Sequence, residues 1–429
     1  MNLCLVSFHC CPFSQLGGDG TGGMNVYLRE LSASLAVVSG VSVDIFTRVQ
    51  NPEIRDIKYI EPNVRVVHLK GGPEHPLNRK RLFDYLPEFA ENLKRFISQN
   101  RIVYDLVYSH YWLSGVVGEF LKHRYSLPLA HAYHTLAFLK KRVMGKDYEE
   151  HPARFSTEEL LASTSDVIVS PSDYEKECII EEYGISPSKV KVISPGVNRF
   201  IFFPLSLHKA RSSLGLKEEE KIVLYVGRIE PEKGLETLIR ALMRLKNEAP
   251  QLFEELKLLV IGGGEKKGEF LKNREIARLT SMVERNGLKE KILFLGSKKH
   301  NELQSYYSAA DVLVIPSLYE SFGLVALESL ACGIPVIASR VGEMKRIIEE
   351  GSNGFLFSPG DSTSLAAALE RIFSQQSSLD SRTEISTDIV KRYSWERTGE
   401  ETCRTLREII RRKRLITTRS RCDEILQRV

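Results

Sequence analysis

Short apolar runs rich in β-branched residues alternate with longer amphipathic segments along the whole chain. This alternation is typical of parallel β-sheets whose two faces are covered by helices. Strands are expected in the first half at residues 3–8, 41–47, 64–69, 106–109, 129–133, 166–170 and 190–194, and in the second half at 222–226, 257–261, 292–295, 312–315, 335–338 and 355–357. The pattern therefore predicts an α/β protein with two doubly wound, Rossmann-like parallel sheets.

Chain length and turn residues predict how these sheets are divided between domains. A chain of 429 residues is longer than one ordinary hydrophobic core supports. A Pro-Gly turn at 195–196 follows the last strand of the first half. We expect an N-terminal Rossmann-like domain at 1–197, a C-terminal Rossmann-like domain at 198–395, and a helix at 396–429 that returns to the first domain. This helix should start after Ser394 and run to about Lys413. Two such domains imply a cleft between them.

Composition favours a soluble globular protein, with 42% hydrophobic and 27% charged residues. The first residues read as a buried strand rather than a signal peptide, and no run approaches the roughly 18 apolar residues of a membrane span. We therefore expect a cytoplasmic protein. Seven cysteines without a C-x-x-C spacing are expected to be reduced thiols, with metal or redox chemistry as the minor alternative.

The net charge of +5 is concentrated at the C-terminus. Residues 404–429 hold nine Arg or Lys against three acidic residues, a charge of +6, so residues 1–403 sum to −1. The cluster at 411–414 could touch anionic lipid or nucleic acid, but Leu406, Ile409 and Ile410 form an apolar stripe suited to docking on a protein core. A solvated helix face is favoured. No nucleic-acid partner is expected, and weak contact with a membrane surface through 404–429 is the alternative.

A glycine-rich turn at 17–23 follows the first expected strand and leads into a helix near Met24. Glycines allow positive φ and close backbone approach, and the helix N-terminus presents free N–H groups to an anion. The turn matches neither a dinucleotide nor a Walker pattern, so a flexible connecting loop is an equal interpretation. The functional interpretation is a phosphate contact at Gly22 and Gly23.

The strand at 222–226 ends in Gly227-Arg228-Ile229-Glu230-Pro231-Glu232-Lys233-Gly234. Ligands of open α/β sheets bind beyond the carboxyl ends of the strands. Arg228 and Lys233 would then supply two positive charges to a diphosphate. The alternative is that both pair with Glu230 or Glu232 at the surface.

A third motif, at 316–328, combines a helix start near Gly323 with two acidic residues. Backbone N–H groups of Ser321, Phe322, Gly323 and Leu324 would face an anion. Glu320 and Glu328 would accept hydrogen bonds from ligand hydroxyls, one from those of a sugar and one from those of a ribose, because carboxylates form strong, charge-assisted hydrogen bonds. Helix capping by Glu320 is the alternative.

Histidines stand at the ends of two strands of the first half, in Ser109-His110-Tyr111-Trp112 and His131-Ala132-Tyr133-His134-Thr135-Leu136. A lone histidine is usually a satisfied core group. At strand ends that face a cleft, however, histidines are placed to meet a substrate. Without a carboxylate or cysteine cluster, no metal site is expected.

With these motifs the chain resembles glycosyltransferase family 4, the retaining GT-B enzymes that include sucrose-phosphate synthases and relatives of glycogen synthase. The resemblance covers nearly the whole chain and is most specific at Glu320-Ser321-Phe322-Gly323 with Glu328, at Gly227-Arg228 with Lys233, and at Tyr393-Ser394-Trp395. It implies transfer of a hexosyl or N-acetylhexosaminyl group from a nucleoside-diphosphate sugar (UDP-, ADP- or GDP-linked) to an acceptor hydroxyl. It also implies that the domain at 1–197 binds the acceptor and the domain at 198–395 binds the nucleotide sugar. The sugar nucleotide is a co-substrate, and no cofactor is implied.

Within the family, the chain is most similar to the inositol-phosphate glycosyltransferases of mycothiol synthesis. The likeness rests on the segments 22–27, 109–115 and 134–137. It implies a small phosphorylated acceptor, such as a polyol or sugar phosphate, held by Asn25, Arg79, Tyr111, Thr135 and Arg154. Arg79 stands where that group is expected to have lysine.

The same resemblance implies the roles of the catalytic residues. His134 contacts the donor sugar near its O6, Arg228 and Lys233 stabilise the departing diphosphate, and Glu320 binds the sugar. Donor binding is expected from Gly22, Gly23, Arg228, Lys233, Glu320, Ser321, Phe322, Gly323, Leu324 and Glu328. Retention in this family is explained by front-face attack without a protein nucleophile.

The sequence leaves other functions open. A nucleotide-sugar 2-epimerase shares the two-domain fold, a transferase acting on a lipid or phosphoinositide would use the basic tail, and a non-enzymatic sugar-nucleotide-binding protein would bind the donor without turnover. The nucleotide base, the donor sugar, the acceptor and the oligomeric state, including a homodimer, are not determined by the sequence.

Overall fold

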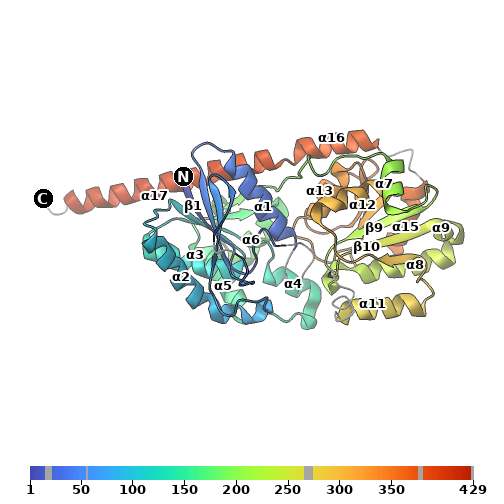
Figure 1. Ribbon diagram of the computed structural model, residues 1–429, viewed down its shortest axis with the longest axis horizontal. Helices are drawn as coiled ribbons and strands as arrows, with labels where there is room; N and C mark the ends of the chain where they lie inside the picture. Colours follow the sequence, from blue (N-terminus) through green and yellow to red (C-terminus); the bar gives the residue numbers. More distant parts are fainter. Residues whose placement is uncertain (15–21, 55–56, 265–273, 375–379, 427–429) are drawn as a thin grey trace. The chain divides into compact units, whose positions relative to one another are not determined.

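The computed structural model describes residues 1–14, 22–54, 57–264, 274–374 and 380–426, which form two compact units (Figure 1). In its described parts, the first unit comprises residues 1–14, 24–194 and 395–426. The second comprises residues 22–23 and 195–394. Each unit is built around one β-sheet.

The first unit contains an eight-stranded sheet with the strand order β3-β4-β2-β1-β5-β6-β7-β8. Its strands are β1 (Asn2–Val6), β2 (Ser42–Arg48), β3 (Ile57–Glu61), β4 (Val64–Leu69), β5 (Leu106–His110), β6 (Leu129–Ala132), β7 (Val167–Ser170) and β8 (Val190–Val192). All neighbouring pairs are parallel except β3 and β4. All strands expected in this half pair in parallel, and the antiparallel edge strand β3 is not among the expected strands. The two residues Pro62 and Asn63 join β3 directly to β4, and so short a connection permits only antiparallel pairing.

Helices cover both faces of this sheet. They are α1 (Gly23–Ala36), α2 (Leu86–Gln99), α3 (Trp112–Tyr125), α4 (Ala137–Met144), α5 (Ala153–Thr164) and α6 (Asp173–Tyr183), with the 3₁₀ turns η1 (Arg79–Arg81), η2 (Phe83–Tyr85), η3 (Gly145–Asp147) and η4 (Pro187–Lys189). The connection through α1 runs toward one edge of the sheet and the connection through α3 toward the other. Because crossovers between parallel strands are right-handed, the two helices lie on opposite faces. The doubly wound prediction is confirmed.

The second unit contains a six-stranded, fully parallel sheet with the order β11-β10-β9-β12-β13-β14. Its strands are β9 (Lys221–Val226), β10 (Leu256–Ile261), β11 (Ile292–Phe294), β12 (Val312–Ile315), β13 (Val336–Ser339) and β14 (Gly354–Phe357). The strands are buried on both faces, which is why each reads as a short, nearly continuous apolar run.

Two hydrophobic cores flank this second sheet. One packs the sheet against α8 (Leu235–Glu248), α9 (Pro250–Glu255), α11 (Arg274–Arg285) and α15 (Ser362–Ser374). The other packs it against α12 (Leu303–Ala309), α13 (Leu324–Ala331), α14 (Met344–Ile347) and α16 (Arg382–Arg392). Helix α7 (Leu207–Leu214) and the turns η5 (Pro231–Lys233) and η6 (His300–Glu302) complete the described elements of the second unit.

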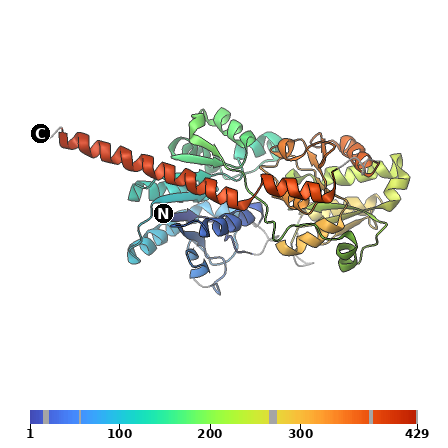
Figure 2. The ribbon, with the colours of Figure 1, turned by 90° about the horizontal axis from the view of Figure 1, so that it is seen from above.

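The long helix α17 (Trp395–Leu426) belongs to the first unit and lies beside α1 (Figures 1 and 2). Leu406 is fully buried and Ile410 nearly so. Gly399 lies against Ser34 so closely that an added Cβ would sit 2.7 Å from its hydroxyl oxygen. The apolar stripe therefore docks on the protein as predicted. The helix continues past Lys413 because no proline or glycine follows to end it. Among the described residues, no helix is long and apolar enough to cross a membrane.

In each sheet the strand order reverses at one point, between β1 and β5 in the first and between β9 and β12 in the second. At such a point the loops leaving neighbouring strands diverge to opposite faces and leave a crevice at the carboxyl ends, where ligands of open α/β sheets bind. The loops after β9 and β12 hold Arg228, Lys233 and Glu320 of the residues predicted to bind the donor. His110 is the last residue of β5, and His134 lies in the loop after β6.

Candidate active site

In the second unit, the loops that leave the carboxyl ends of several strands pack against one another. The backbone N–H of Leu318 donates to the carbonyl of Glu232 at 2.8 Å and links the loops after β12 and β9. Gly234 has φ +68°, and a Cβ there would lie 1.9 Å from the carbonyl oxygen of Pro316. Only glycine permits this approach, so the loop that carries Lys233 is fixed by backbone packing.

Lys233 and Glu320 meet in this loop cluster. Lys233 Nζ lies 2.7 Å from Glu320 Oε2, and the side chains are 20% and 14% exposed. The hydroxyl of Ser317 donates to the same oxygen at 3.4 Å. An ammonium group has three donors, so two of them stay available to an anion while Glu320 orients the side chain. The structure thus brings together two of the residues predicted to bind the donor.

Arg228 pairs with Glu230 through Nη1 and Oε1 at 2.5 Å, the interaction considered above as the alternative for both cations. Both side chains are about 30% exposed, so this pair is weak and its geometry adjustable. Gly22 and Gly23 group with the second unit, where a Cβ would lie 3.8 Å from Arg228 and from Leu324, respectively. The rest of the predicted phosphate turn, residues 17–21, lies outside the described residues.

Helix α13 starts at Leu324 with Gly323 as its N-cap residue, and no side chain caps it. Gly323 has φ +91°, and a Cβ would lie 2.4 Å from Cε of Met344. The side chain of Phe322 is buried in the core, so only its backbone faces the helix start. The contribution of the segment from Ser321 to Leu324 to donor binding stays a prediction.

Glu328 lies inside α13 and is 5% exposed. Its Oε1 lies 2.7 Å from Nε2 of His300, and its Oε2 accepts from the hydroxyl of Tyr307 at 2.8 Å. Both partners come from the segment after β11, and His300 is itself buried. The carboxylate is therefore held in one orientation, and each oxygen keeps a second lone pair for a further donor. His300 and Tyr307 are not among the site residues predicted from the sequence.

In the first unit, aromatic and histidine side chains gather at the carboxyl ends of β1, β5 and β6. The rings of His9 and Tyr111 lie 4.5 Å apart, and Nδ1 of His110 lies 2.9 Å from Nε2 of His134. Tyr111 and His134 both have positive φ, +73° and +60°. Such backbone strain in non-glycine residues is concentrated at functional sites. His134 is partly exposed, whereas His110 is fully buried.

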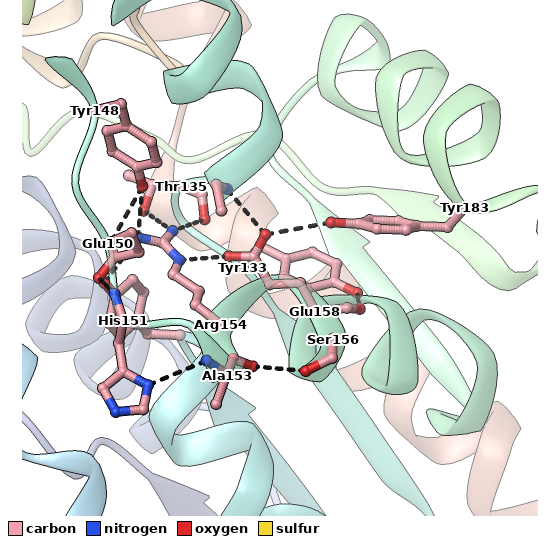
Figure 3. A network of polar contacts seen from close by, with 12 residues as sticks. Tyr133, Thr135, Tyr148, Glu150, His151, Ala153, Arg154, Ser156, Glu158 and Tyr183 are labelled. Atoms are coloured by element: carbon pink, nitrogen blue, oxygen red, sulfur yellow. Dashed lines mark hydrogen bonds and ion pairs between the residues drawn. The ribbon is translucent and has the colours of Figure 1, made fainter. Parts of the chain in front are cut away.

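Arg154, on α5, lies at the centre of a buried polar network (Figure 3). Its Nε donates to Glu158 at 2.7 Å and its Nη1 to Glu150 at 2.5 Å. Nη1 also donates to the hydroxyl of Tyr111 at 3.1 Å, and Nη2 donates to the carbonyl and hydroxyl oxygens of Thr135 at 2.9 and 3.0 Å. The structure thus joins three of the five predicted acceptor residues, Tyr111, Thr135 and Arg154.

The charge of Arg154 is balanced within this network. Two carboxylates face the single guanidinium, so the group as a whole is negative when both are ionised. Burial raises the pKa of Glu158 although Arg154 opposes the shift. Burial also acts to raise the pKa of Glu150, but Arg154 and the hydrogen bonds to Glu150 outweigh it and leave that pKa below its ordinary value. Arg154 therefore orients Tyr111 and Thr135, and its charge is already compensated.

Arg79 provides a second positive charge on the same side of the first unit. It lies on η1 and is partly exposed, and no described carboxylate is within ion-pair distance of it. Burial, and then the charges of Arg79, His134 and Arg154, lower the pKa of His9 well below its ordinary value. Asn25 is 1% exposed and donates to the carbonyl of Cys11 at 2.8 Å, so it fixes the loop after β1.

Several residues of the site in the first unit are not among those predicted from the sequence. Glu150 and Glu158 flank Arg154 at spacings of four residues, a signal for contact along a helix that was available. His9 follows the first strand as His134 follows β6, and the same strand-end argument applies to it. Within the described ranges, no group of three or more His, Cys, Asp or Glu side chains is arranged to hold a metal ion.

Comparison with protein families gives two adjoining matches. Residues 21–199 match the family described as Glycosyltransferase Family 4, and residues 208–389 match Glycosyl transferases group 1. The chain is 34% identical over 404 residues to the D-inositol 3-phosphate glycosyltransferase of Nocardioides sp., covering 93% of this chain and 88% of that protein. It is 36% identical over 373 residues to the protein of the same name from Streptosporangium roseum, covering 85% and 83%.

Among solved structures, sucrose-phosphate synthase from Thermosynechococcus elongatus superimposes with a TM-score of 0.86 and 31% identity, covering 95% of this chain and 98% of that one. Anabaena HepE, solved in complex with UDP and glucose, gives a TM-score of 0.71 at 19% identity, covering 95% and 100%. The second likeness shows the fold alone.

Proposed function

Because this chain belongs to glycosyltransferase family 4 and is a GT-B glycosyltransferase, we propose that it transfers a hexosyl or N-acetylhexosaminyl group, with retention, from a nucleoside-diphosphate sugar. The proposed acceptor is a hydroxyl of a phosphorylated polyol or sugar. The relatives named above as D-inositol 3-phosphate glycosyltransferases support this class of acceptor.

The observation that carries the donor assignment is the pairing of Lys233 with Glu320 at the point where the strand order of the second sheet reverses. The two available N–H groups of Lys233 would bind oxygens of the diphosphate, and Arg228 would release Glu230 to join it. Negative charge grows on the diphosphate as the bond to the sugar breaks. One preorganised donor to such developing charge contributes about 3–4 kcal/mol to the barrier reduction.

Glu320 and Glu328 would bind hydroxyls of the donor. Oε2 of Glu320 accepts from Lys233 and Ser317, which leaves Oε1 for a sugar hydroxyl. Glu328 is oriented by His300 and Tyr307, as a rigid acceptor for ribose hydroxyls requires. Hydroxyls that pair with carboxylates in a partly dry site are recognised strongly.

Arg79 would bind the acceptor phosphate, because the charge of Arg154 is already compensated by Glu150 and Glu158. Tyr111 and Thr135, oriented by Arg154, would add hydroxyl donors to the same phosphate. In the transfer step, the bond from C1 to the diphosphate oxygen breaks and a bond from C1 to the acceptor oxygen forms on the same face. The acceptor proton passes to the departing diphosphate oxygen, so no protein nucleophile takes part.

The test is a turnover assay on the full chain. UDP-, ADP- and GDP-linked sugars are each combined with inositol phosphate, hexose phosphates and the unphosphorylated forms, and release of nucleoside diphosphate is followed. We expect release that depends on both donor and phosphorylated acceptor. Conversion of the donor alone to an isomer would instead identify a 2-epimerase, and turnover only with lipid vesicles would identify a lipid acceptor.

An Arg79→Ala variant tests the acceptor assignment within the same assay. Loss of a hydrogen-bonded charge should raise KM for the phosphorylated acceptor by about tenfold or more and leave KM for the donor unchanged. Lys80→Ala is the matched control, because Lys80 is the next residue and pairs with exposed Glu149. Equal effects of the two substitutions would contradict the assignment of Arg79.

A further inference from the structure

Two histidines from adjacent parallel strands share one hydrogen bond. His110 is the last residue of β5, and His134 follows β6 by two residues. Nδ1 of His110 lies 2.9 Å from Nε2 of His134. Only one proton can lie between these two nitrogens, so the contact couples the tautomers of the two rings.

Both imidazoles are neutral at ordinary pH. Burial, and then the neighbouring histidines, lower the pKa of His110 well below its usual value, and burial lowers the pKa of His134 to about 3. A neutral ring carries one N–H. If His110 donates from Nδ1, its Nε2 is bare, and His134 must carry its own proton on Nδ1. If His134 donates instead, His110 must carry its proton on Nε2.

The surroundings of His110 decide between these two arrangements. Its Nε2 is buried and has no hydrogen-bond partner among the described residues. Aromatic rings lie around it, with the centroid of Tyr108 at 4.1 Å and that of Tyr27 at 6.0 Å. A buried N–H without an acceptor is rarer in proteins than an under-used acceptor. The bare nitrogen therefore belongs at Nε2, and the proton of His110 at Nδ1.

The two ring nitrogens of His134, Nε2 and Nδ1, then have different hydrogen-bonding roles. Its Nε2 accepts a hydrogen bond from His110. Its Nδ1 forms no hydrogen bond with a described residue, and the side chain of His134 is partly exposed. The ring stands edge to face with Tyr27 at 5.1 Å, and the positive φ of His134 fixes the direction in which the side chain leaves the backbone.

We propose that His110 is a positioning residue that locks His134 as the Nδ1–H tautomer, so that His134 presents a neutral hydrogen-bond donor to an oxygen atom of the bound substrate. The proposal rests on the proposed function for the identity of that substrate. In this state His134 acts neither as a base nor as a cation. It binds oxygens whose negative charge grows or stays constant through the reaction.

The direct test is ¹⁵N NMR of the full chain with labelled histidine, because protonated and bare ring nitrogens have well-separated shifts and distinct couplings to the ring protons. We expect His134 to show a protonated Nδ1 and a bare Nε2, and His110 the same pattern, with no substrate added. A protonated Nε2 on His134 would overturn the proposal.

Two substitutions test whether His110 sets this state. The amide nitrogen of an His110→Asn side chain lies as many bonds from Cα as Nδ1 and can still donate, whereas His110→Phe keeps an aromatic ring without a donor. We expect His134 to stay Nδ1–H in the Asn variant and to show both tautomers in the Phe variant. In the Phe variant kcat should fall by about tenfold to a hundredfold, with KM for the acceptor nearly unchanged.

His131→Asn is the matched control. His131 is also fully buried, and its Nδ1 lies 2.8 Å from the hydroxyl of Ser109. If a general packing defect lowered kcat, the His131→Asn and His110→Phe variants would lose activity alike, and the His134 tautomer would stay unchanged in both. That result would overturn the positioning role. The NMR result does not depend on turnover. A locked Nδ1–H tautomer in a protein that transfers no sugar would refute the proposed function and leave the tautomer assignment standing.

Discussion

Replacing Arg154 by methionine tests the buried network of the first unit. The substitution removes the guanidinium but keeps a long side chain, so the main change is the loss of charge and hydrogen bonds. Arg154 and Glu158 have side-chain exposures of 2% and 1%. Removing one partner of a buried ion pair destabilises a protein by about 3–5 kcal/mol, because the remaining charge is buried without compensation.

The environment of Glu158 places the expected loss near the lower end of that range. Glu158 keeps hydrogen bonds from the backbone N–H of Ala137 at 2.9 Å and from the hydroxyl of Tyr183 at 3.2 Å. Glu150 is 15% exposed and can turn toward water. We expect a loss of about 3 kcal/mol, which lowers the Tm of a unit of this size by about 6–12 °C.

The loss should also depend on pH. In the variant no positive charge opposes the effect of burial, so the pKa of Glu158 rises further above its unfolded value. A raised folded-state pKa favours the folded protein below that pKa, where the carboxyl is protonated, and penalises it above. The variant should therefore be closer to wild type in stability at pH 5 than at pH 8.

Urea unfolding of the wild type, Arg154→Met and the double variant Arg154→Met/Glu158→Gln measures these differences. The double variant should regain more than half of the lost stability, because the amide carries no charge to bury. Lys80→Met, which removes an exposed pair with Glu149, should unfold like the wild type. A loss below about 1 kcal/mol for Arg154→Met, or a double variant no more stable than the single one, would refute the reasoning.

Three further predictions concern the second unit. Lys233→Ala should lower kcat by about a hundredfold or more with the Tm nearly unchanged, because it removes a donor to the departing diphosphate; an unchanged kcat would exclude Lys233 from the mechanism. His300→Ala should weaken binding of the nucleoside diphosphate about tenfold in calorimetry, since Glu328 loses one of the two partners that orient it; binding as tight as in the wild type would show that this contact is not needed. Gly234→Ala should destabilise the second unit or displace its loop, because the new Cβ would lie 1.9 Å from the carbonyl of Pro316; a variant with wild-type Tm and kcat would contradict that packing.

The sheets could be predicted because their strands are buried on both faces. Segments such as 222–226 and 312–315 are nearly continuous apolar runs bounded by turn residues, and this pattern leaves little choice of secondary structure. Strand β3 was missed because most of its residues are exposed, with Lys58 and Tyr59 among them, and its partner β4 supplies the register. Edge strands of this kind are determined by pairing and not by their own hydrophobic pattern.

Residues of the candidate site could be predicted where their position after a strand was sufficient to place them at the carboxyl edge of a sheet. Lys233, Glu320 and His134 all follow buried strands, so their placement at the carboxyl edge of a sheet follows from the fold. The partners of these residues were not predictable in the same way. His300 meets Glu328 across 28 residues of chain, and no local pattern in the sequence links the two.

The compensation of the positive charge of Arg154 could not be predicted from the sequence. The resemblance to a family transfers a role to one residue, but two glutamates decide how much positive charge that residue can offer. Burial and hydrogen bonding are properties of the folded protein, so the compensation of Arg154 could only be recognised in three dimensions. It shifts the expected phosphate contact toward Arg79.

Retaining transfer from a sugar nucleotide to a phosphorylated acceptor is the central claim, and ¹H NMR of the reaction tests it most directly. The full chain is incubated with an α-linked nucleoside-diphosphate sugar and a phosphorylated polyol, and the anomeric proton of the first product formed is observed. The account predicts an anomeric signal with the small H1–H2 coupling of an α-linkage, appearing together with free nucleoside diphosphate. A β-linked product, or a donor consumed without any new bond to the acceptor, would contradict it.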